Sequence, residues 1–507
     1  MNILWDIVHT LNILFIGFIL FFERKESARR MAWLLTLVLL PGIGMILYLL
    51  FSGHFFTRTK RMSTTTAYIN EKLKNLKAEQ LAYLKERRHE LPNHVIKDYF
   101  PLVDMNLSKG GSLLTATDSI EIYRWGQDMF TQLKKDLQAA ERTINMEFFI
   151  FHNDATGCEI MEILCRKARE GVDVKLLYDD FGSISTPTGF FRKLDKAGGK
   201  SLAFFPVRRG LPFSINFRNH RKITVIDGTI AYMGGVNVGD EYANRNRSNR
   251  KPFWRDTHIR FTGTSVVQLQ TVFCIDWFSM PAWKTRLHGP EDTAKYFPPN
   301  VFSDFTQQVS VKEHPDIFDT IFSTGKIPTQ IVTAGPDDIQ KTEIEDALIR
   351  MIMSAKKYVY IQTPYFTPDA QFFTALRIAA FSGVDVRIMV PGVWDKFYVK
   401  AASHEFMREM LALGIKFYQY NGFIHSKTMV VDRKIATVGS TNIDTRSFEL
   451  HFEVNAIFYD AKLALTCEKI FLDDIKNAAE ASKGTFDNHF ILKRAWRGFC
   501  KLFSPLM

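Results

Sequence analysis

The sequence predicts an α/β protein of two similar lobes that follow a membrane-anchoring segment. Three observations indicate this: two apolar stretches near the N-terminus, an order of helical and strand-like segments that occurs twice, and a motif over residues 220–237 that returns over residues 425–442. The chain has 507 residues, 46% of them apolar. That length suits at least two globular domains better than one hydrophobic core.

The two apolar stretches, residues 3–22 and 31–51, predict the anchor. Each is long enough to cross about 30 Å of hydrocarbon as a helix. The basic residues follow the first stretch, whereas a cleaved signal peptide carries them before it. We therefore expect a transmembrane hairpin of two helices over residues 1–56. Asp6 and the Pro41–Gly42 pair weaken the two spans, so one spanning helix plus a re-entrant or interfacial segment is an alternative.

Charge and cysteine content narrow the class of protein. A net charge of +11 suits attraction to anionic lipid or to nucleic acid, and charge alone does not separate the two. Basic residues on both sides of the second apolar stretch leave the membrane side of the lobes open. The five cysteines are scattered without C-x-x-C spacing, which predicts buried free thiols and argues against a disulfide framework or a zinc site.

The rest of the chain divides into five segments. Residues 57–112 predict a polar linker with a charged helix over 68–91. In the first lobe, residues 113–290, we expect helices over 127–142 and 159–170 and strands over 143–151 and 172–178. In the second lobe, residues 329–485, we expect helices over 341–355 and 369–382 and strands over 358–363 and 384–390. A connecting segment, residues 291–328, joins the lobes, and a basic amphipathic tail, residues 486–507, ends the chain. The alternation indicates α/β lobes, and its return indicates duplication.

The repeated motif is the sharpest signal in the sequence. Residues 220–237 read HRKITVIDGTIAYMGGVN and residues 425–442 read HSKTMVVDRKIATVGSTN, without a gap and with identical His, Lys, Val, Asp, Ile, Ala, Gly and Asn. One H-x-K-x4-D match can arise by chance. Two matches in register, in the same βα context, make chance a poor explanation.

The spacing within the motif suggests what each residue type does. Residues two apart on a strand point to the same face, so the His and Lys of each copy stand side by side. The two Asp residues fall at strand ends, and Asp-Gly is a hairpin signal, so we interpret them as turn or orienting residues and not as proton carriers. The motif residues are His220, Lys222, Asp227, His425, Lys427 and Asp432.

The expected hairpins also suggest where a substrate lies. If the first hairpin turns at residues 227–228, Gly235 lies opposite His220, and the same geometry places Ser440 opposite His425. A small residue there leaves room for a substrate. Asn237 and Asn442, which follow, are candidates with Ser440 to bind phosphate oxygens.

These residue types fit phosphodiester transfer. A neutral imidazole attacks phosphorus and forms a phosphohistidine, and a second, protonated imidazole protonates the departing alkoxide. Lysines and asparagines stabilise the developing charge without a metal or other cofactor. Each His needs a partner that fixes its tautomer, and the strand after each motif offers one, Asp256 and Glu453. The remaining histidines considered lack paired context, and we expect them to be structural: His152, His258, His404 and His451.

These motifs resemble the phospholipase D superfamily, and further strings resemble bacterial cardiolipin synthases over nearly the whole chain. The strings are NFRNHRKITVIDG (216–228), GGVNVGDEY (234–242), WRDTHIRFTG (254–263), QIVTAGPD (330–337), QTPYFTPD (362–369) and IHSKTMVVDRKIATVGSTNIDTRSFELHFEVN (424–455). The resemblance implies two phospholipase D-like lobes, each a mixed sheet flanked by helices, related by a pseudo-two-fold. It implies that two phosphatidylglycerol molecules give cardiolipin and glycerol, with His220 as nucleophile and His425 as general acid and base. It also implies a multi-pass protein of the bacterial cell membrane whose partners are phosphatidylglycerol and other anionic lipids.

Other functions remain to be weighed against this one. A membrane-bound phospholipase D-type hydrolase would use the same residues with water as acceptor. A nuclease would use the positive charge, but the membrane hairpin argues against a nucleic-acid partner. A non-enzymatic scaffold is disfavoured because both motifs are intact.

Overall fold

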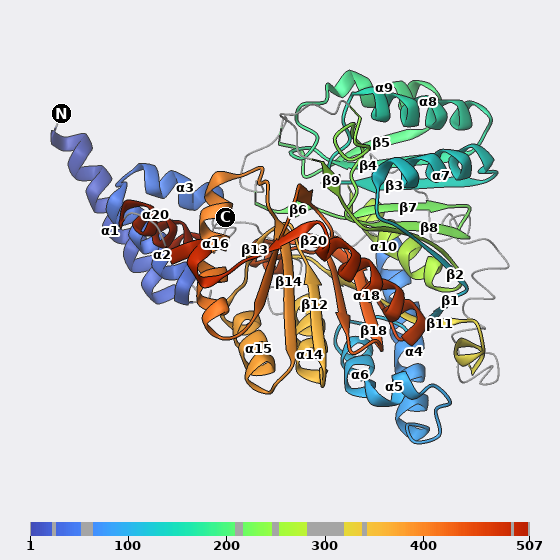
Figure 1. Ribbon diagram of the computed structural model, residues 1–507. Helices are drawn as coiled ribbons and strands as arrows, with labels where there is room; N and C mark the ends of the chain where they lie inside the picture. The colour runs from blue at the N-terminus through green and yellow to red at the C-terminus, as the bar shows by residue number, and fades with distance from the viewer. Residues whose placement is uncertain are drawn as a thin grey trace.

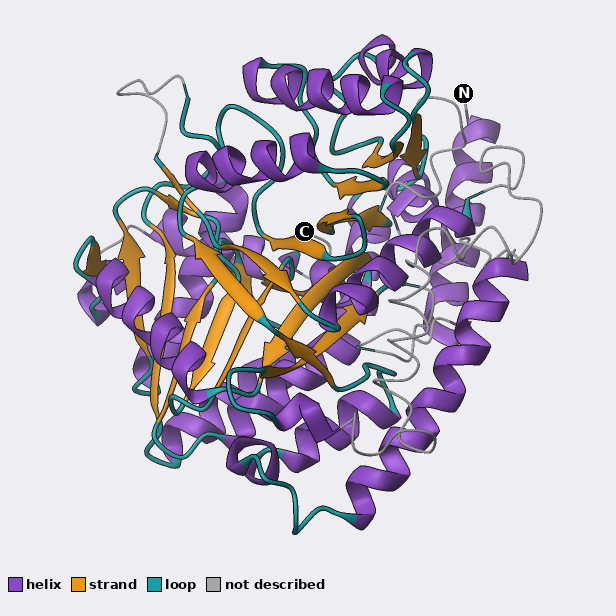
Figure 2. Cartoon of the chain, turned by 90° about the vertical axis from the view of Figure 1, so that its right-hand side faces the viewer, coloured by secondary structure: helices purple, strands orange, loops and turns teal. Residues whose placement is uncertain are grey.

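The computed structural model describes residues 2–22, 27–51, 64–207, 216–245, 253–280, 319–336, 342–487 and 491–504. Residues 57–63 of the expected linker, residues 281–318, which include most of the expected connecting segment, and residues 505–507 of the tail lie outside the described residues. The chain forms two mixed β-sheets in the middle of the molecule with helices around them (Figures 1 and 2). The α/β fold class is confirmed.

The first sheet comes from the first half of the chain and has seven strands in the order β2-β10-β8-β7-β3-β4-β5. β3, β4 and β5 run parallel, and β7, β8 and β10 add antiparallel strands. Helices α7 (Gly126–Ala139), α8 (Ala155–Arg169) and α9 (Thr188–Lys196) lie over one face (Figure 1) and share an apolar core with it. The strands are β2 (Ser119–Tyr123), β3 (Thr143–Phe148), β4 (Asp173–Asp179), β5 (Lys200–Phe204), β7 (Lys222–Ile226), β8 (Ile230–Gly234) and β10 (His258–Thr262).

The second sheet repeats this plan. β12, β14 and β15 run parallel, and β17, β18 and β20 run antiparallel, in the order β1-β11-β20-β18-β17-β12-β14-β15-β21. Helices α14 (Glu343–Ser354), α15 (Ala370–Phe381) and α16 (Phe397–Ala412) share one core with it, and α18 (Ala461–Ile475) shares another. The strands are β1 (Thr115–Thr117), β11 (Ile327–Ala334), β12 (Tyr358–Gln362), β14 (Asp385–Pro391), β15 (Lys416–Tyr420), β17 (Thr428–Val431), β18 (Ile435–Gly439), β20 (His451–Phe458) and β21 (Ala478–Glu480).

The remaining elements connect these layers. The charged helix expected after the anchor is α4 (Thr64–Glu86), and its Leu76 and Leu84 pack in the core of the second lobe. β1 also joins the second sheet, because it pairs with β11. The other elements are α5 (His94–Asp98), α6 (Phe100–Ser108), β6 (Arg218–Asn219), β9 (Trp254–Arg255), α10 (Ser265–Ser279), η3 (Thr320–Phe322), β13 (Phe366–Thr367), β16 (Phe423–Ile424), β19 (Ile443–Asp444), α17 (Thr445–Glu449) and α19 (Lys483–Asp487).

An apolar seam joins the two lobes. Ile223, Met233 and Phe261 of the first sheet share one buried cluster with Val438 and Val454 of the second. All five side chains are almost fully removed from water. Burial of apolar area contributes about 25 cal/mol per Å², so this seam favours a fixed arrangement of the lobes. The ends of β7, β8, β17 and β18 are thereby held in one region.

Two short strands cross the seam and pair with the opposite lobe. β6, which precedes His220, pairs in parallel with the start of β20 in the second lobe. β16, which precedes His425, pairs in parallel with β9 of the first lobe. Each lobe thus contributes one short strand to the other lobe, at equivalent places in the two motifs. Such a reciprocal arrangement is what a pseudo-two-fold axis between the lobes produces.

The motif hairpins differ from expectation by one residue. β7 ends at Ile226 and β8 begins at Ile230, so the loop has three residues and Ile223 pairs with Met233. The second hairpin has the same loop length, and Val431 pairs with Ile435. The expected pairings of Gly235 with His220 and of Ser440 with His425 are therefore wrong, because a loop of three residues shifts the register by one residue relative to a two-residue turn.

The aspartates of the motifs occupy these turns, as expected. Asp227 and Asp432 both have φ of +53°, a left-handed conformation that Asp tolerates better than most residues. The Asp227 carboxylate accepts hydrogen bonds from the backbone N–H groups of residues 141, 142 and 143 at 2.8–2.9 Å. Asp432 accepts the equivalent three bonds from residues 356, 357 and 358. Each aspartate therefore ties its hairpin turn to the start of a neighbouring strand, β3 for Asp227 and β12 for Asp432. The turn lies at the end of β7 or β17 that is far from the motif histidine.

The N-terminal anchor is only partly the hairpin expected. Helix α1 (Asn2–Phe22) is continuous, and Trp5–Phe22 is the one candidate membrane span among the described residues. The second apolar stretch is two shorter helices, α2 (Ser27–Leu39) and α3 (Ile43–Phe51). The break falls at Pro41 and at Gly42, whose φ is +82°. Trp33 and Tyr48 of these helices pack with Ile19 of α1, so the three helices form one unit (Figure 1).

The tail and the cysteines agree with what the sequence suggests. The described part of the tail forms helix α20 (Ile491–Leu502), which packs Cys500 against Ala401 and Ala402 of α16 and leaves Trp496 and Phe499 substantially exposed. Figure 1 shows α20 beside the N-terminal helices. All five cysteines are free, and all but Cys158 are buried.

The turn role of Asp227 predicts a loss of stability without a loss of chemistry. Asp227→Asn keeps the left-handed conformation but places an amide N–H₂ group among backbone donors. We expect the free energy of unfolding to fall by about 1–2 kcal/mol in detergent, with kcat changed less than about threefold. Asp118→Asn, at an exposed ion pair with Lys326, is the matched control and should cost less than about 1 kcal/mol. A variant that melts normally but has no activity would instead place Asp227 in the chemistry.

Candidate active site

The exchanged strands bring the two motif histidines to the seam. The backbone N–H of His220 donates to the carbonyl of Phe452 at 2.9 Å, and that of His425 donates to the carbonyl of Arg255 at 2.7 Å. Each histidine is therefore fastened to the opposite lobe through its main chain. His220 is 7% exposed and His425 is 5% exposed, so both imidazoles lie in a nearly closed site.

The carboxylate partners are also exchanged. His220 Nδ1 lies 2.8 Å from Glu453 Oε1, and His425 Nδ1 lies 2.7 Å from Asp256 Oδ2. Each histidine is thus oriented by the carboxyl group that follows the other motif. In its ionised form, each acid favours the tautomer with the proton on Nδ1, which leaves the Nε2 lone pair for chemistry.

The small residues near the end of each motif, Gly235 and Ser440, lie against these carboxyl groups. A Cβ atom on Gly235 would lie 2.0 Å from Asp256 Oδ1, so no larger residue fits beside the shorter acid. At the equivalent place in the second lobe, the Ser440 hydroxyl donates to Glu453 Oε2. Ser440 is therefore engaged by the acid that orients His220, and direct contact with phosphate stays a prediction.

The motif lysines stand beside the histidines, as the two-residue spacing predicts. Lys222 and Lys427 are buried, and each Nζ donates to the backbone carbonyl of the histidine two residues before it. Lys222 Nζ also lies 5.5 Å from the centre of the Phe149 ring. Each of the two lysines lowers the pKa of His220, so both copies of the motif act on one site.

The motif asparagines have unequal surroundings. Asn237 accepts a hydrogen bond from the Ile150 N–H at 3.1 Å and donates to the Tyr242 hydroxyl at 2.8 Å. Asn442 is buried, and its Oδ1 has no hydrogen-bond partner among the described residues. Both ends of the Asn237 amide are therefore hydrogen-bonded within the protein, whereas the Oδ1 atom of Asn442 is not bonded among the described residues.

Burial and positive charge dominate the basic groups of the site. Burial, and then Lys222, lower the pKa of His220 well below its ordinary value. Burial, and then Lys427, lower the pKa of His425 to about 4, against the opposing pull of Asp256. Burial also lowers the pKa of Lys222 to about 7 and that of Lys427 to about 8. A site that holds these cationic groups out of water favours a bound anion.

The two carboxyl groups differ in their acidity. Burial raises the pKa of Glu453 to about 8. Burial would raise the pKa of Asp256 too, but His425 and Lys427 beside it hold that pKa below its ordinary value. At neutral pH Asp256 is therefore a fixed anion next to His425, and His220 has the more weakly acidic partner.

A buried hydrogen-bond network lies next to the second histidine, His425. Asp474 of α18 accepts from Arg255 Nη2 at 2.6 Å and from Gln362 Nε2 at 2.8 Å. Ser426 donates to Gln362 at 3.0 Å, and its hydroxyl lies 2.7 Å from that of Thr257. The strand end that holds Asp256 is therefore fixed from both lobes.

His451, expected to be structural, lies in the site. Its ring centre is 5.5 Å from that of His220, and its Nδ1 is 3.8 Å from Glu453 Oε1. His451 and Glu453 are two apart on β20, so they share a face of that strand, and this spacing is the signal that sequence reasoning missed. His220, His451 and Glu453 are the one group among the described residues spaced closely enough to bind a metal ion. Their possible ligand atoms lie within 4.8 Å of one another.

The aromatic lining of the site was also not foreseen. The ring centre of Phe149 lies 5.0 Å from that of His220. The rings of Trp254, Tyr242 and Phe423 lie 5.3–5.8 Å from that of His425. These rings exclude water around both imidazoles and strengthen the electrostatic interactions between them.

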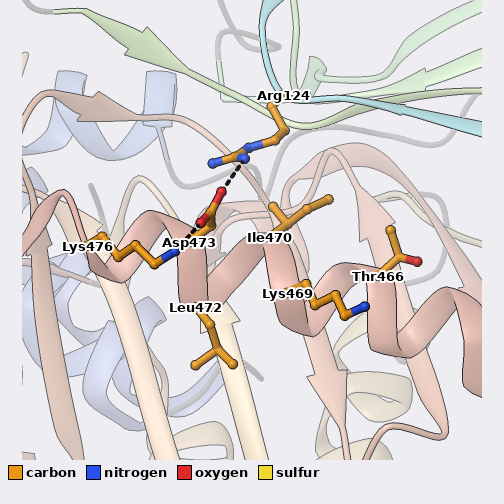
Figure 3. Close-up of a pocket in the computed structure, with 7 residues that line it drawn as sticks. All are labelled: Arg124, Thr466, Lys469, Ile470, Leu472, Asp473 and Lys476. Carbon is orange, nitrogen blue, oxygen red and sulfur yellow. Dashed lines mark hydrogen bonds and ion pairs between the residues drawn. The ribbon is translucent and has the colours of Figure 1, made fainter.

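Cavities elsewhere do not belong to this site. A hollow of about 500 Å³ runs along α18, lined by Lys469, Leu472 and Lys476, where Asp473 pairs with Arg124 at 2.9 Å (Figure 3). A second cavity, of about 590 Å³, lies between the lobe and the anchor and is lined in part by Met31 of α2, Phe406 of α16 and Leu502 of α20. Neither is lined by a motif residue.

Comparison with known proteins gives a consistent family. The family model described as cardiolipin synthase, PLD-like domain, matches residues 133–250 and 348–475, and the phospholipase D-nuclease N-terminal model matches residues 10–53. A cardiolipin synthase of Listeria innocua is 36% identical over 98% of this chain and 97% of its own length. One of Staphylococcus aureus is 38% identical over 98% and 95%. Among solved structures, phosphatidylserine synthase of Haemophilus influenzae aligns with 80% of this chain and all of its own at a TM-score of 0.59 and 13% identity, which is a likeness of fold.

The lowered lysine pKa values predict an alkaline limit to activity. Lys222 is charged below a pKa of about 7 and neutral above it, and Lys427 follows at about 8. If these charges bind phosphate, kcat/KM should fall as pH rises through 7 to 8. Lys222→Arg keeps its charge and should move the decline to higher pH, even at a lower maximal rate. Lys326→Arg, at an exposed ion pair, is the control and should leave the profile unchanged. A Lys222→Arg profile that overlays the wild-type profile would show that other groups set the limit.

Proposed function

Because the chain belongs to the cardiolipin synthase family, we propose that it joins two phosphatidylglycerol molecules through a phosphohistidine intermediate. The chain is a phosphatidyltransferase of the phospholipase D type. One observation carries the proposed mechanism: each of two buried histidines is oriented by a carboxyl group from the opposite lobe, so both serve one phosphate. The residue roles below are our proposal.

The first half-reaction forms a bond to His220. Its Nδ1 faces Glu453, so Nε2 is the nitrogen free to attack phosphorus. The pKa of His220 is held well below its ordinary value, which keeps the imidazole neutral and nucleophilic. The phosphorus–oxygen bond to the glycerol headgroup breaks as the nitrogen–phosphorus bond forms. The charge on the phosphoryl oxygens is stabilised by Lys222 and Lys427.

His425 is the better placed general acid and base. The ionised Asp256 at its Nδ1 stabilises an imidazolium, and the substrate phosphate adds a second negative charge that raises the pKa of the ring. His425 gives its proton to the departing glycerol oxygen. It then takes the proton of the incoming hydroxyl of a second phosphatidylglycerol, as the nitrogen–phosphorus bond breaks. Cardiolipin and glycerol are the products, and both histidines return to their starting state.

The anchor supplies the lipid. The chain is associated with the membrane through its N-terminal apolar helices. We propose that α1 crosses the bilayer and that α2 and α3 form a second, broken crossing, so that the protein is a multi-pass protein of a bacterial cell membrane. Broken helices are tolerated at membrane depth where neighbouring helices satisfy the freed backbone groups. Here the N–H of Gly44 still donates to the carbonyl of Leu40 across the break, and Val8 of α1 lies beside Gly42.

Product analysis tests the proposed reaction. Full-length protein in mixed micelles with phosphatidylglycerol should release glycerol and cardiolipin in equal amounts. His220→Ala and His425→Ala should each lower the rate by about a thousandfold or more, because each removes one of the two groups in the proposed proton and phosphoryl transfers. His404→Ala, on α16, is the control. Phosphatidic acid as the sole lipid product would identify a hydrolase instead.

An activated donor separates the roles of the two histidines. A phosphatidyl ester of p-nitrophenol needs no acid for its leaving group. His425→Ala should therefore release about one equivalent of p-nitrophenol per active site in a rapid burst and keep a phosphatidyl group on His220, detectable by mass spectrometry. His220→Ala should give no burst. The opposite pattern would exchange the two assignments.

A further inference from the structure

His451 has no place in the mechanism above, although it lies beside the nucleophile. It is the first residue of β20, two positions before Glu453, and its ring centre is 5.5 Å from that of His220. The side chain is 12% exposed. Both ring nitrogens are buried, and neither has a hydrogen-bond partner among the described residues. A buried imidazole without a partner loses hydrogen bonds that water would supply, unless a ligand provides them.

The charges around His451 indicate what kind of ligand this is. After burial, the groups that lower the pKa of His451 are all cations: Arg446, Lys222, Arg218 and Lys396. They come from both lobes. Such a field opposes a metal ion, even though His451, His220 and Glu453 have ligand-like spacing. It favours an anion, to which the imidazole donates one hydrogen bond and the guanidinium of Arg446 adds charge.

The proposed reaction supplies such an anion. The second phosphatidylglycerol brings its own phosphate, which is separated from the attacking hydroxyl by only the three carbons of glycerol. When that hydroxyl reaches the phosphorus on His220, the second phosphate must lie a short distance from the His220 ring. His451 occupies such a place.

The approach from the membrane is consistent with this position. Arg446 belongs to the short helix α17, and its neighbour Thr445 lines the cavity between the lobe and the anchor. Met31 of α2 and Leu502 of α20 line the same cavity, together with Phe373 and Phe406. Its volume of about 590 Å³ is within the range of ligand-binding cavities. Arg446 therefore directly follows a residue of this cavity, and its charge acts on His451 beside the nucleophile.

We propose that His451 and Arg446 form a subsite for the phosphate of the acceptor lipid. This rests on the proposed function and deepens it. Water has no phosphate to bind there. The subsite therefore directs the phosphohistidine intermediate toward a lipid acceptor and away from hydrolysis.

The test measures how the intermediate divides between two acceptors. The p-nitrophenyl donor forms the intermediate, and cardiolipin and phosphatidic acid are then counted with phosphatidylglycerol present. Both products arise from the same intermediate, so a variant that only slows His220 leaves their ratio unchanged. His451→Phe, which keeps a ring but no N–H, and Arg446→Gln should each lower the ratio of cardiolipin to phosphatidic acid by about tenfold or more. His451→Gln keeps a donor and should recover part of it.

Free glycerol is the second acceptor, because it carries the hydroxyl without the phosphate. Transfer to labelled glycerol, relative to hydrolysis, should change less than about twofold in all three variants. His404→Phe is the matched control and should behave as the wild type with both acceptors. The size of the p-nitrophenol burst reports the fraction of folded, active protein in each preparation.

Three results would overturn the subsite. The product ratio could stay unchanged in His451→Phe and Arg446→Gln, transfer to glycerol could fall as much as transfer to the lipid, or both variants could fail to form the intermediate. Wild-type protein that makes no cardiolipin would instead refute the proposed function itself, so the two failures are distinguishable.

Discussion

The exchange of His–carboxyl pairs across the lobe seam is the constraint on which the rest of the structure depends. His220 reaches Glu453 and His425 reaches Asp256, and the backbone of each histidine is bonded to the strand that carries its acid. Neither lobe alone holds a complete catalytic pair. A buried hydrogen-bonding group that loses its partner costs about 1–3 kcal/mol, so these contacts tie the site to the arrangement of the lobes. The apolar seam of β7, β8, β18 and β20 fixes that arrangement.

The two halves of the site have kept the same backbone and diverged in chemistry. Gly235 leaves room for a short acid, Asp256, whereas Ser440 donates a hydrogen bond to a longer one, Glu453. The acid beside His425 is ionised at neutral pH, and the acid beside His220 is harder to ionise. A reaction with one nucleophile and one proton carrier needs such inequality. Duplication followed by a few substitutions at the acids provides it.

The electrostatics of the buried centre also explain its dependence on an anionic substrate. Lysines with lowered pKa values and uncharged histidines describe a site that is short of negative charge. In the proposed reaction a phosphodiester supplies that charge, which favours the protonated forms of the lysines and of His425. Arg446, which directly follows a residue of the cavity beside the anchor, adds to the same positive field around His451. In the proposed reaction the membrane supplies both the donor lipid, whose phosphate lies at His220, and the acceptor lipid, whose phosphate lies at His451.

Much of the local structure could be predicted from the sequence, because it depends on neighbours along the chain. The strand and helix order of each lobe, the place of His220 beside Lys222 and the turn position of Asp227 follow from periodicity and turn chemistry. The residues that failed prediction depend on finer or more distant geometry. A three-residue loop in place of a two-residue turn shifted the register, so that Gly235 faces Asp256 and not His220. The Pro41–Gly42 break divides a stretch whose composition alone suits one long helix.

The sequence by itself singled out the side chains that we propose for the chemistry, since the paired motifs, their acids and the apolar N-terminus are all local patterns. Only the tertiary structure decided which acid serves which histidine, because residues 220 and 453 or 425 and 256 meet through strands exchanged between lobes. It likewise decided that His451 belongs to the site, through the pairing of β20 with β6. Contacts between residues so distant in the chain depend on how the two sheets pack. The periodicity of the sequence depends only on neighbours along the chain, so it does not predict that packing.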